Sequence, residues 1–148
     1  MVSKRLLGNL ASRGDFMNAK SFLTLLLFGM AQVSHAAAET TTPDAQLQRF
    51  ATEAKRAGVV ELGQQFFVKK HGHEWSCASC HGESPTSPGR HATTAKVLEP
   101  LAPAFNPRSL TDSARVDKWF RRNCKDVLGR ECTAGEKADV LAWLSSLK

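Results

Sequence analysis

Residues 77–81 of this chain read Cys-Ala-Ser-Cys-His, and this stretch decides both the cofactor and the fold that we predict. C-x-x-C-H is the pattern that attaches a c-type haem. In that chemistry the sulfurs of Cys77 and Cys80 form thioether bonds to the vinyl groups, and His81 lies beneath the iron and donates a ring nitrogen. The sequence therefore predicts one covalent haem c, with Cys77 and Cys80 as attachment residues and His81 as an axial iron ligand.

Two other uses of these cysteines give a poorer account of the chain. A thioredoxin-like C-x-x-C lies between a strand and a helix of a βαβ unit, and the sequence shows no alternating strand pattern. A zinc site would need a second C-x-x-C or a histidine pair. The remaining cysteines, Cys124 and Cys132, have seven residues between them. Haem attachment is thus the favoured interpretation.

The N-terminal residues 1–38 read as a signal peptide for export. Lys20 supplies the positive start, and Phe22–Met30 is a short apolar segment. Small residues follow it, so cleavage after Ala38 fits the usual pattern. Met17 is an alternative start, because the residues before it add nothing that a signal peptide needs. The apolar segment is short for a bilayer span, and a retained membrane anchor is therefore the less favoured interpretation.

The part that remains after cleavage, residues 39–148, is the size of one domain, which we expect in the periplasm. The whole chain has 148 residues, of which 42% are hydrophobic and 23% charged, so a disordered tail protein is not expected. It carries 20 basic and 14 acidic side chains, and removing four basic and one acidic with the signal peptide leaves a net charge of +3. This mildly basic balance lacks a polybasic stripe and argues against nucleic-acid binding.

Hydrophobic periodicity predicts an all-α domain of short helices around the haem. We expect helices over Ala45–Ala57, Val59–Lys70, Ser113–Leu128 and Thr133–Leu147, the last opening with the capping box Thr133-Ala134-Gly135-Glu136, and a short helix near His91–Leu98. Gly58 should end the first helix, and Leu62, Phe66 and Phe67 should share one face of the second. The segment Gly82–Pro107 holds five of the six prolines, so it cannot be one helix and is expected to wrap around a ligand.

The iron needs a ligand on its second face, and the residues leave several candidates open. Small electron-transfer cytochromes usually use Met or His there. All three methionines fall within the predicted signal peptide. His71 and His73 lie within ten residues of His81, so the opposite face is awkward for them to reach. His91 lies only ten residues beyond His81, where a loop position or a contact to a haem propionate is the more usual role.

A helical wheel over residues 113–128 adds Asn123 to these candidates. With Val116 at 0° and about 100° per residue, Val127 falls near +20°, Phe120 near +40° and Asn123 near −20°. An amide inside an apolar face is costly unless it has a partner. Iron, or a group held over iron, would be one partner, and a loop carbonyl or a buried water would be another. The spacing alone does not choose between them.

Most of the chain after the signal peptide resembles the sphaeroides haem protein family. The motifs that carry the resemblance, in their mutual order, are Cys77–His81, Leu101–Pro107, Thr111-Asp112, Lys118–Cys124 and Glu136–Asp139. The members are high-spin, oxygen-binding class I cytochromes c, related to cytochrome c″. The resemblance therefore implies a class I cytochrome c fold with a covalently attached haem.

The resemblance also implies roles for residues around the late cysteines. In that family the residue directly before the first late cysteine is an asparagine that ligates iron and leaves on reduction, and Asn123 occupies that place. Relatives of the cytochrome c″ type carry histidine there, which this chain does not. A disulfide between Cys124 and Cys132 is implied as well, and it would use the two cysteines left over in an oxidising compartment. The implied partners are a dihaem cytochrome c and a membrane cytochrome b.

Together these observations predict an exported monohaem c-type cytochrome that transfers electrons, releases Asn123 on reduction and then binds O₂ or NO at the open haem face. Two alternatives stay open: a simple electron carrier, and a haem enzyme that reacts with oxygen or peroxide species. A peroxidase normally needs a distal histidine with an arginine, and no such pair stands out. A docking role is considered for four cations, Arg121, Arg122, Lys125 and Arg130, because charge steers encounter.

Overall fold

The computed structural model describes residues 40–72 and 74–148, which belong to one compact unit of the chain. Its elements are α1 (Pro43–Ala54), α2 (Val60–Val68), α3 (Ala78–His81), β1 (Gly89–Arg90), β2 (Val97–Leu98), α4 (Ser113–Leu128) and α5 (Ala134–Ser146). The expected all-α class is confirmed, since each strand has only two residues. The expected signal peptide, residues 1–38 with Met17, lies outside the described residues. No described helix combines the length and apolar character needed to cross a membrane.

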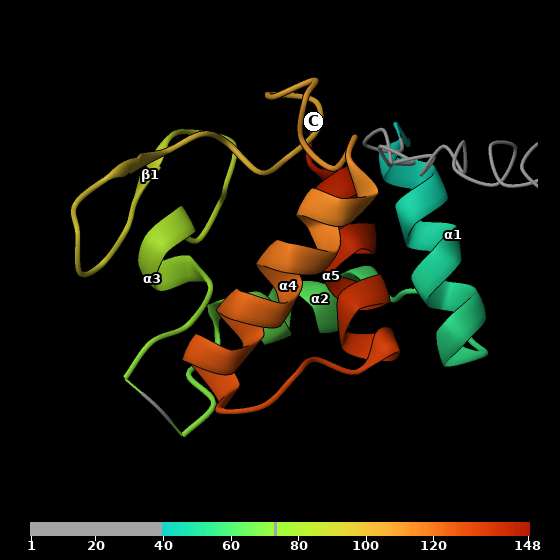
Figure 1. The fold of residues 1–148 in the computed structure, drawn as a ribbon, viewed down its shortest axis with the longest axis horizontal. Helices are drawn as coiled ribbons and strands as arrows, with labels where there is room; N and C mark the ends of the chain where they lie inside the picture. Colours follow the sequence, from blue (N-terminus) through green and yellow to red (C-terminus); the bar gives the residue numbers. More distant parts are fainter. Residues whose placement is uncertain (1–39, 73) are drawn as a thin grey trace, which may run out of the picture. The chain divides into compact units, whose positions relative to one another are not determined.

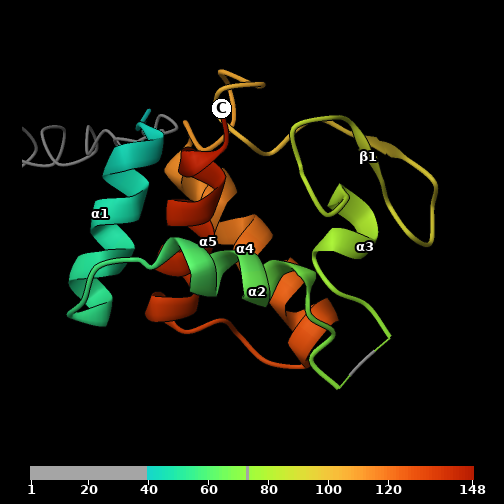
Figure 2. The ribbon, with the colours of Figure 1, turned by 180° about the vertical axis from the view of Figure 1, so that it is seen from behind.

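Helix α5 is the centre of the core, and it packs against both α1 and α2 (Figures 1 and 2). The expected capping box starts it: the Thr133 side chain accepts from the Glu136 amide, and the Glu136 carboxylate accepts from the Thr133 amide. Every residue from Ala138 to Leu144 is buried, Leu141 completely. A helix buried on all sides needs neighbours on all sides, which fixes where the other helices lie.

Two features of α2 bring it close to α5. A Cβ at Gly63 would overlap the carbonyl oxygen of Asp139 and lie 3.0 Å from the Cβ of Trp143. Glycine at this position therefore permits the close contact between the two helices. Phe67 is buried, with its ring centroid 4.8 Å from that of Trp143. Leu62, expected on one face with Phe66 and Phe67, is 46% exposed.

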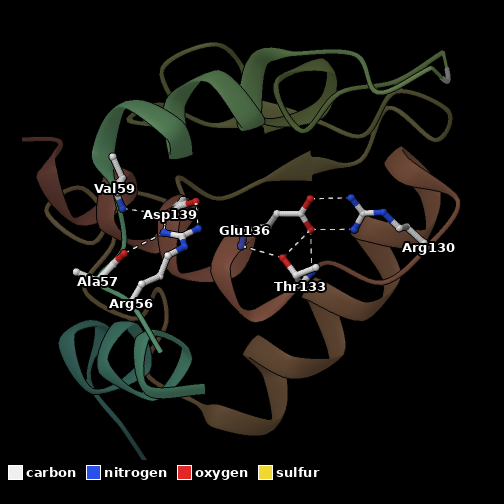
Figure 3. Close-up of polar contacts among 7 residues, drawn as sticks. All are labelled: Arg56, Ala57, Val59, Arg130, Thr133, Glu136 and Asp139. Atoms are coloured by element: carbon white, nitrogen blue, oxygen red, sulfur yellow. Dashed lines mark hydrogen bonds and ion pairs between the residues drawn. The ribbon is translucent and has the colours of Figure 1, made fainter. Parts of the chain in front are cut away.

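A buried carboxylate joins α5 to the connection between α1 and α2 (Figure 3). The Asp139 side chain accepts two hydrogen bonds of 2.7 Å from Arg56 and one of 2.8 Å from the Val59 amide. Burial alone would raise the pKa of Asp139, but these hydrogen bonds outweigh it and hold the pKa below its ordinary value. The ion pair spans 83 positions of sequence and stabilises the corner at which the chain turns into α2.

Helix α4 begins and ends as predicted, with the Asp112 side chain capping it and Gly129 in the left-handed conformation that closes it. Its first half is fastened to α1. Arg49 pairs with Asp117 at 2.7 Å, and the Phe50 and Phe120 rings meet edge to face with centroids 5.6 Å apart. This attachment sets the rotation of α4 and hence the directions of its remaining side chains.

Two sequence predictions are wrong. The helix expected near 91–98 is an antiparallel hairpin in which Gly89 faces Leu98 and Arg90 faces Val97. So short a helix is marginal alone, and the β-branched residues in this stretch favour extended backbone. The first helix ends at Ala54 rather than at the expected Ala57, because Lys55 takes the left-handed conformation (φ 55°) before Gly58 is reached.

Candidate functional site

The residues of the C-x-x-C-H motif form a single helical turn. Cys77 precedes α3, and its carbonyl accepts from the His81 amide at 3.1 Å. Gly82, with φ 78°, ends the turn. Side chains three and four positions apart lie on one face of a helix, so Cys77, Cys80 and His81 share a face. The structure brings these three predicted site residues together.

Two serines hold this turn in shape, and the sequence analysis missed them. The amide of Ser76 donates to the Ser79 hydroxyl at 2.9 Å, and the amide of Ser79 donates to the Ser76 hydroxyl at 3.2 Å. Ser76 is buried. The signal was a serine at each end of an S-x-x-S spacing, which resembles a capping box. The attachment turn is therefore fixed by its own hydrogen bonds.

The strand β1 supports the turn from its other side. A Cβ at Gly89 would overlap the carbonyl oxygen of Cys80 and lie 2.9 Å from the Cα of His81. The hairpin also reaches one of the thiols, since the amide of Ala92 donates to Cys80 Sγ at 3.3 Å. No local pattern marks this contact, because it joins residues twelve positions apart. Gly89 itself was the one local sequence feature that could have indicated the close approach of the hairpin to the attachment turn.

Both cysteines of the motif are free thiols and half-buried. Burial raises the pKa of Cys77 to about 11, and the nearby Cys80 adds to the shift. A redox-active C-x-x-C depends on a lowered cysteine pKa, so a thioredoxin-like use finds no support here. A thiol that stays protonated and unpaired is available for thioether formation.

The imidazole of His81 is held in its neutral form. Burial, with a smaller contribution from the neighbouring His91, lowers the pKa of His81 to about 4. A neutral imidazole offers a ring nitrogen lone pair, which is the form that binds a metal. The Phe67 ring lies beside it, with centroids 6.3 Å apart. Two free thiols and one neutral imidazole on a single turn fit the donor set of a c-type haem.

Two of the remaining histidines make local contacts. Within residues 40–72 and 74–148, no group of three or more His, Cys, Asp and Glu side chains is placed to hold a metal ion. His71 Nε2 lies 2.9 Å from the carbonyl oxygen of Phe66, where it donates. His91 Nδ1 accepts from the amides of Thr93 and Thr94, each at 3.3 Å. Both rings are thus engaged locally, and His73 lies outside the described residues.

Asn123 lies on α4, at the edge of the face that enters the core. Val116, Cys124 and Val127 are buried, whereas Asn123 is half-buried and Trp119 is 46% exposed. Within the described part of the chain, the side-chain amide of Asn123 makes no hydrogen bond, whether to α3 or to any other residue. The next residue, Cys124, is disulfide-bonded to Cys132 in the structure, with the two Cα atoms 5.5 Å apart. That bond fastens the end of α4 to the start of α5.

Comparisons with known proteins agree on one group of relatives. A family model described as a domain of unknown function, DUF1924, matches residues 51–144. The cytochrome c-type protein SHP of Cereibacter sphaeroides is 55% identical over 71 residues, which are 48% of this chain and 54% of SHP. Cytochrome c″ of Methylophilus methylotrophus is 32% identical over 130 residues, covering 81% of this chain and 90% of that protein.

Solved structures of the same two proteins resemble the fold. Oxidised SHP, described as an oxygen-binding cytochrome c, superposes with a TM-score of 0.68 at 41% identity and covers 72% of this chain and 98% of SHP. Oxidised cytochrome c″ gives 0.66 at 31% identity, covering 72% and 94%. A solution structure of cytochrome c″, which concerns haem-ligand detachment in that protein, gives 0.63 at 32% identity with the same coverage.

Proposed function

Because this chain belongs to the family of c-type cytochromes that includes SHP and cytochrome c″, we propose that it is an exported monohaem cytochrome that transfers electrons and admits a small gas at its haem once reduced. The membership confirms the resemblance read from the sequence motifs. The observation that carries the proposal is the attachment turn, which presents two free thiols and a neutral imidazole on one face. A covalently bound haem c supplies reversible one-electron chemistry there.

In this proposal each residue of the turn has a defined task. Cys77 and Cys80 tether the haem through their sulfurs, and His81 binds the iron through its neutral ring. Ser76 and Ser79 keep the turn formed, so that the sulfurs and the imidazole stay on the same side. The preformed geometry reduces the conformational entropy lost on attachment.

Asn123 is the ligand that we assign to the second face of the oxidised iron. Its amide has no hydrogen-bond partner within the described residues, and it lies on the half-exposed edge of an otherwise anchored helix. An amide oxygen is a weak donor that suits ferric iron better than ferrous iron. A bound haem would therefore hold Asn123 less tightly when reduced, and the position next to the Asn123 side chain would then be open to O₂ or NO. The Cys124–Cys132 disulfide limits how far the backbone of Asn123 can shift, so we assign the movement to the side chain.

Replacing the amide tests this assignment. In Asn123→Ala the haem should stay attached, the ferric absorption spectrum should change, and cyanide should bind the ferric protein faster. If the Asn123 ligand contributes about 1.4 kcal/mol, its loss should raise the rate of cyanide binding roughly tenfold. The matched control is Arg121→Ala, an exposed residue of the same helix, which should leave both measurements unchanged. An unaltered ferric spectrum in Asn123→Ala would remove Asn123 from the iron.

A peroxide-consuming haem enzyme is the alternative class, and α4 lacks one of the side chains that such an enzyme normally uses. Cleavage of an O–O bond by a peroxidase normally uses a distal histidine with an arginine, and the sequence of α4 contains no histidine. Stopped-flow oxidation of the reduced protein by O₂ or by peroxide, compared with its electron exchange with a purified cytochrome, separates the classes. Faster turnover with peroxide than with the cytochrome would favour the enzyme.

Location and partners complete the proposal. Export to the periplasm agrees with the Cys124–Cys132 disulfide, because disulfides form and persist in oxidising compartments. The resemblance read from the sequence implies a dihaem cytochrome c and a membrane cytochrome b as redox partners. Haem staining of periplasmic and cytoplasmic fractions on a denaturing gel tests the location directly.

A further inference from the structure

The outer face of α4 carries a concentration of unpaired positive charge. Its members are five exposed cations, Arg115, Lys118, Arg121, Arg122 and Lys125, hereafter the α4 basic face. Within the described residues the ion pairs join Arg49 to Asp117, Arg56 to Asp139 and Arg130 to Glu136. None of them neutralises a member of the basic face.

Helix geometry places all five side chains on one side. At about 100° per residue they fall within an arc of roughly 120°, centred opposite to Val116 and Phe120. Asp117, the acid inside the same stretch, is turned to α1 and paired with Arg49. Asp126 lies beside the edge of the arc, and its single negative charge does not offset the five positive charges of the face. The anchoring of α4 to α1 therefore fixes which way the charge points.

An exposed aromatic ring borders the face. Trp119 is 46% exposed and contacts two of the cations, with Lys118 Nζ 5.7 Å and Arg122 Cζ 5.3 Å from its ring centroid. Trp119 also lies between this face and Asn123 on the helix wheel. A protein bound to the α4 basic face would thus contact the helix one side chain away from the proposed ligand.

The positive surface continues beyond the end of α4. A hollow of about 310 Å³ is lined by Arg121, Lys125, Gly129, Arg130 and Glu131. A neighbouring hollow of about 370 Å³, which shares Arg130, is lined also by Lys69 and Lys70 after α2. Arg130 itself is held by Glu136 through two hydrogen bonds, so its charge is already balanced and we leave it out of the face.

We propose that the α4 basic face is the docking surface for an acidic electron-transfer protein. The inference rests on the proposed redox function and adds the partner's charge and its place of contact. Charge of one sign on one face steers a complementary protein to that face. Arginine and tryptophan are also the residues enriched in protein interfaces. A helix of 16 residues is about 24 Å long, which suits a small transient contact.

The test uses the holoprotein and a reduced flavodoxin, an acidic one-electron carrier, as the probe. The second-order rate of haem reduction is followed by stopped flow at increasing ionic strength. The wild-type rate should fall as salt rises. In Arg115→Gln/Lys118→Gln/Arg122→Gln the low-salt rate should fall roughly tenfold and lose most of its salt dependence. The ferric spectrum of this variant must match the wild type, which shows that Asn123 is undisturbed.

The matched control removes the same charge elsewhere. Lys96→Gln/Arg108→Gln/Lys148→Gln replaces three exposed cations outside α4 and should slow the reaction less than about twofold. Equal slowing in both variants would show that net charge acts rather than this face, and would overturn the proposal. An unchanged rate in the α4 variant would overturn it as well.

Two further measurements distinguish protein docking from a failure of electron transfer and from binding to other anionic surfaces. Calorimetric titration with oxidised flavodoxin reports docking without electron transfer, so a failed redox function and a failed docking surface give different results. Vesicles of phosphatidylcholine with and without phosphatidylserine, and a DNA duplex, test other anionic surfaces. If the α4 variant loses binding to anionic vesicles or DNA while its affinity for flavodoxin is unchanged, the face is not a protein-docking surface.

Discussion

The α5 region and the attachment region of this protein are built by different means. From Ala138 to Leu144 every residue of α5 is buried, and its neighbours α1 and α2 supply Phe50 and Phe67. Between residues 74 and 112, which include the attachment turn and the hairpin, four residues are buried: Ser76, Pro85, Ala102 and Ser109. One region is held by apolar packing and the other mainly by hydrogen bonds.

The hydrogen bonds of the attachment region connect its loops to one another. The Pro85 carbonyl accepts from the amides of Leu101 and Ala102 at 3.0 and 3.1 Å, and the Ser109 hydroxyl donates to the Leu101 carbonyl at 2.6 Å. Such bonds define a conformation but add only about 1 kcal/mol each. The packing around α5 therefore provides most of the stability, while the proposed haem-binding region depends on the group attached to it.

Removing the attachment thiols should change the protein most. In Cys77→Ala/Cys80→Ala the covalent haem should be lost completely, as haem staining on a denaturing gel will show. Hydrogen exchange should then increase much more for amides between residues 82 and 112 than for those of α5, because only α5 has its own apolar packing. A uniform increase over both regions would contradict the division.

A second prediction compares two leucines of different surroundings. Leu141 is fully buried in α5, whereas Leu62 on α2 is 46% exposed. Leu141→Ala should lower the free energy of unfolding by about 2–5 kcal/mol, since it leaves a cavity. Leu62→Ala removes the same atoms from the surface and should cost less than about 0.5 kcal/mol. Urea unfolding of both holoproteins makes the measurement, and similar costs would mean that the core is wrongly located.

Local signals made the α5 region and the attachment turn predictable from sequence. The capping box Thr133–Glu136 and the Asp112 cap of α4 each lie within a few residues of the backbone that they satisfy. The C-x-x-C-H motif is equally local. The structure adds what no local pattern states: Arg56 meets Asp139, 83 positions away, and Gly89 lies against the carbonyl of Cys80.

The errors have the same origin. The hairpin at residues 89–98 depends on pairing between strands and on Ala95 in the left-handed conformation (φ 57°), which non-glycine residues rarely adopt. The α1 terminus was placed too late because Lys55, and not Gly58, takes that conformation. For Asn123 the helix wheel correctly placed the side chain near Val116 and Val127. How far Asn123 is exposed could not be predicted, because it depends on how α4 is attached to α1.

A third prediction, with a smaller effect than Leu141→Ala, concerns the polar start of α5 and tests whether it adds to the stability that the apolar core provides. Hydrogen bonding from Arg130 lowers the pKa of Glu136 to about 2, while partial burial opposes the shift and the Thr133 amide adds to it. Since this pKa lies below the ordinary value of 4.5, the stabilisation is complete above pH 4.5 and is lost as pH falls toward 2.

Glu136→Gln should therefore cost about 1 kcal/mol at pH 7, the usual contribution of a capping residue, and should flatten the acid dependence of stability. Urea unfolding at pH 7, 5 and 3 makes the comparison. Glu131→Gln is the control, because this neighbouring carboxylate is exposed and its side chain makes no hydrogen bond within the described residues. If Glu136→Gln and the wild type lose equal stability between pH 5 and 3, the Arg130 pairing contributes nothing and apolar burial alone holds α5 in place.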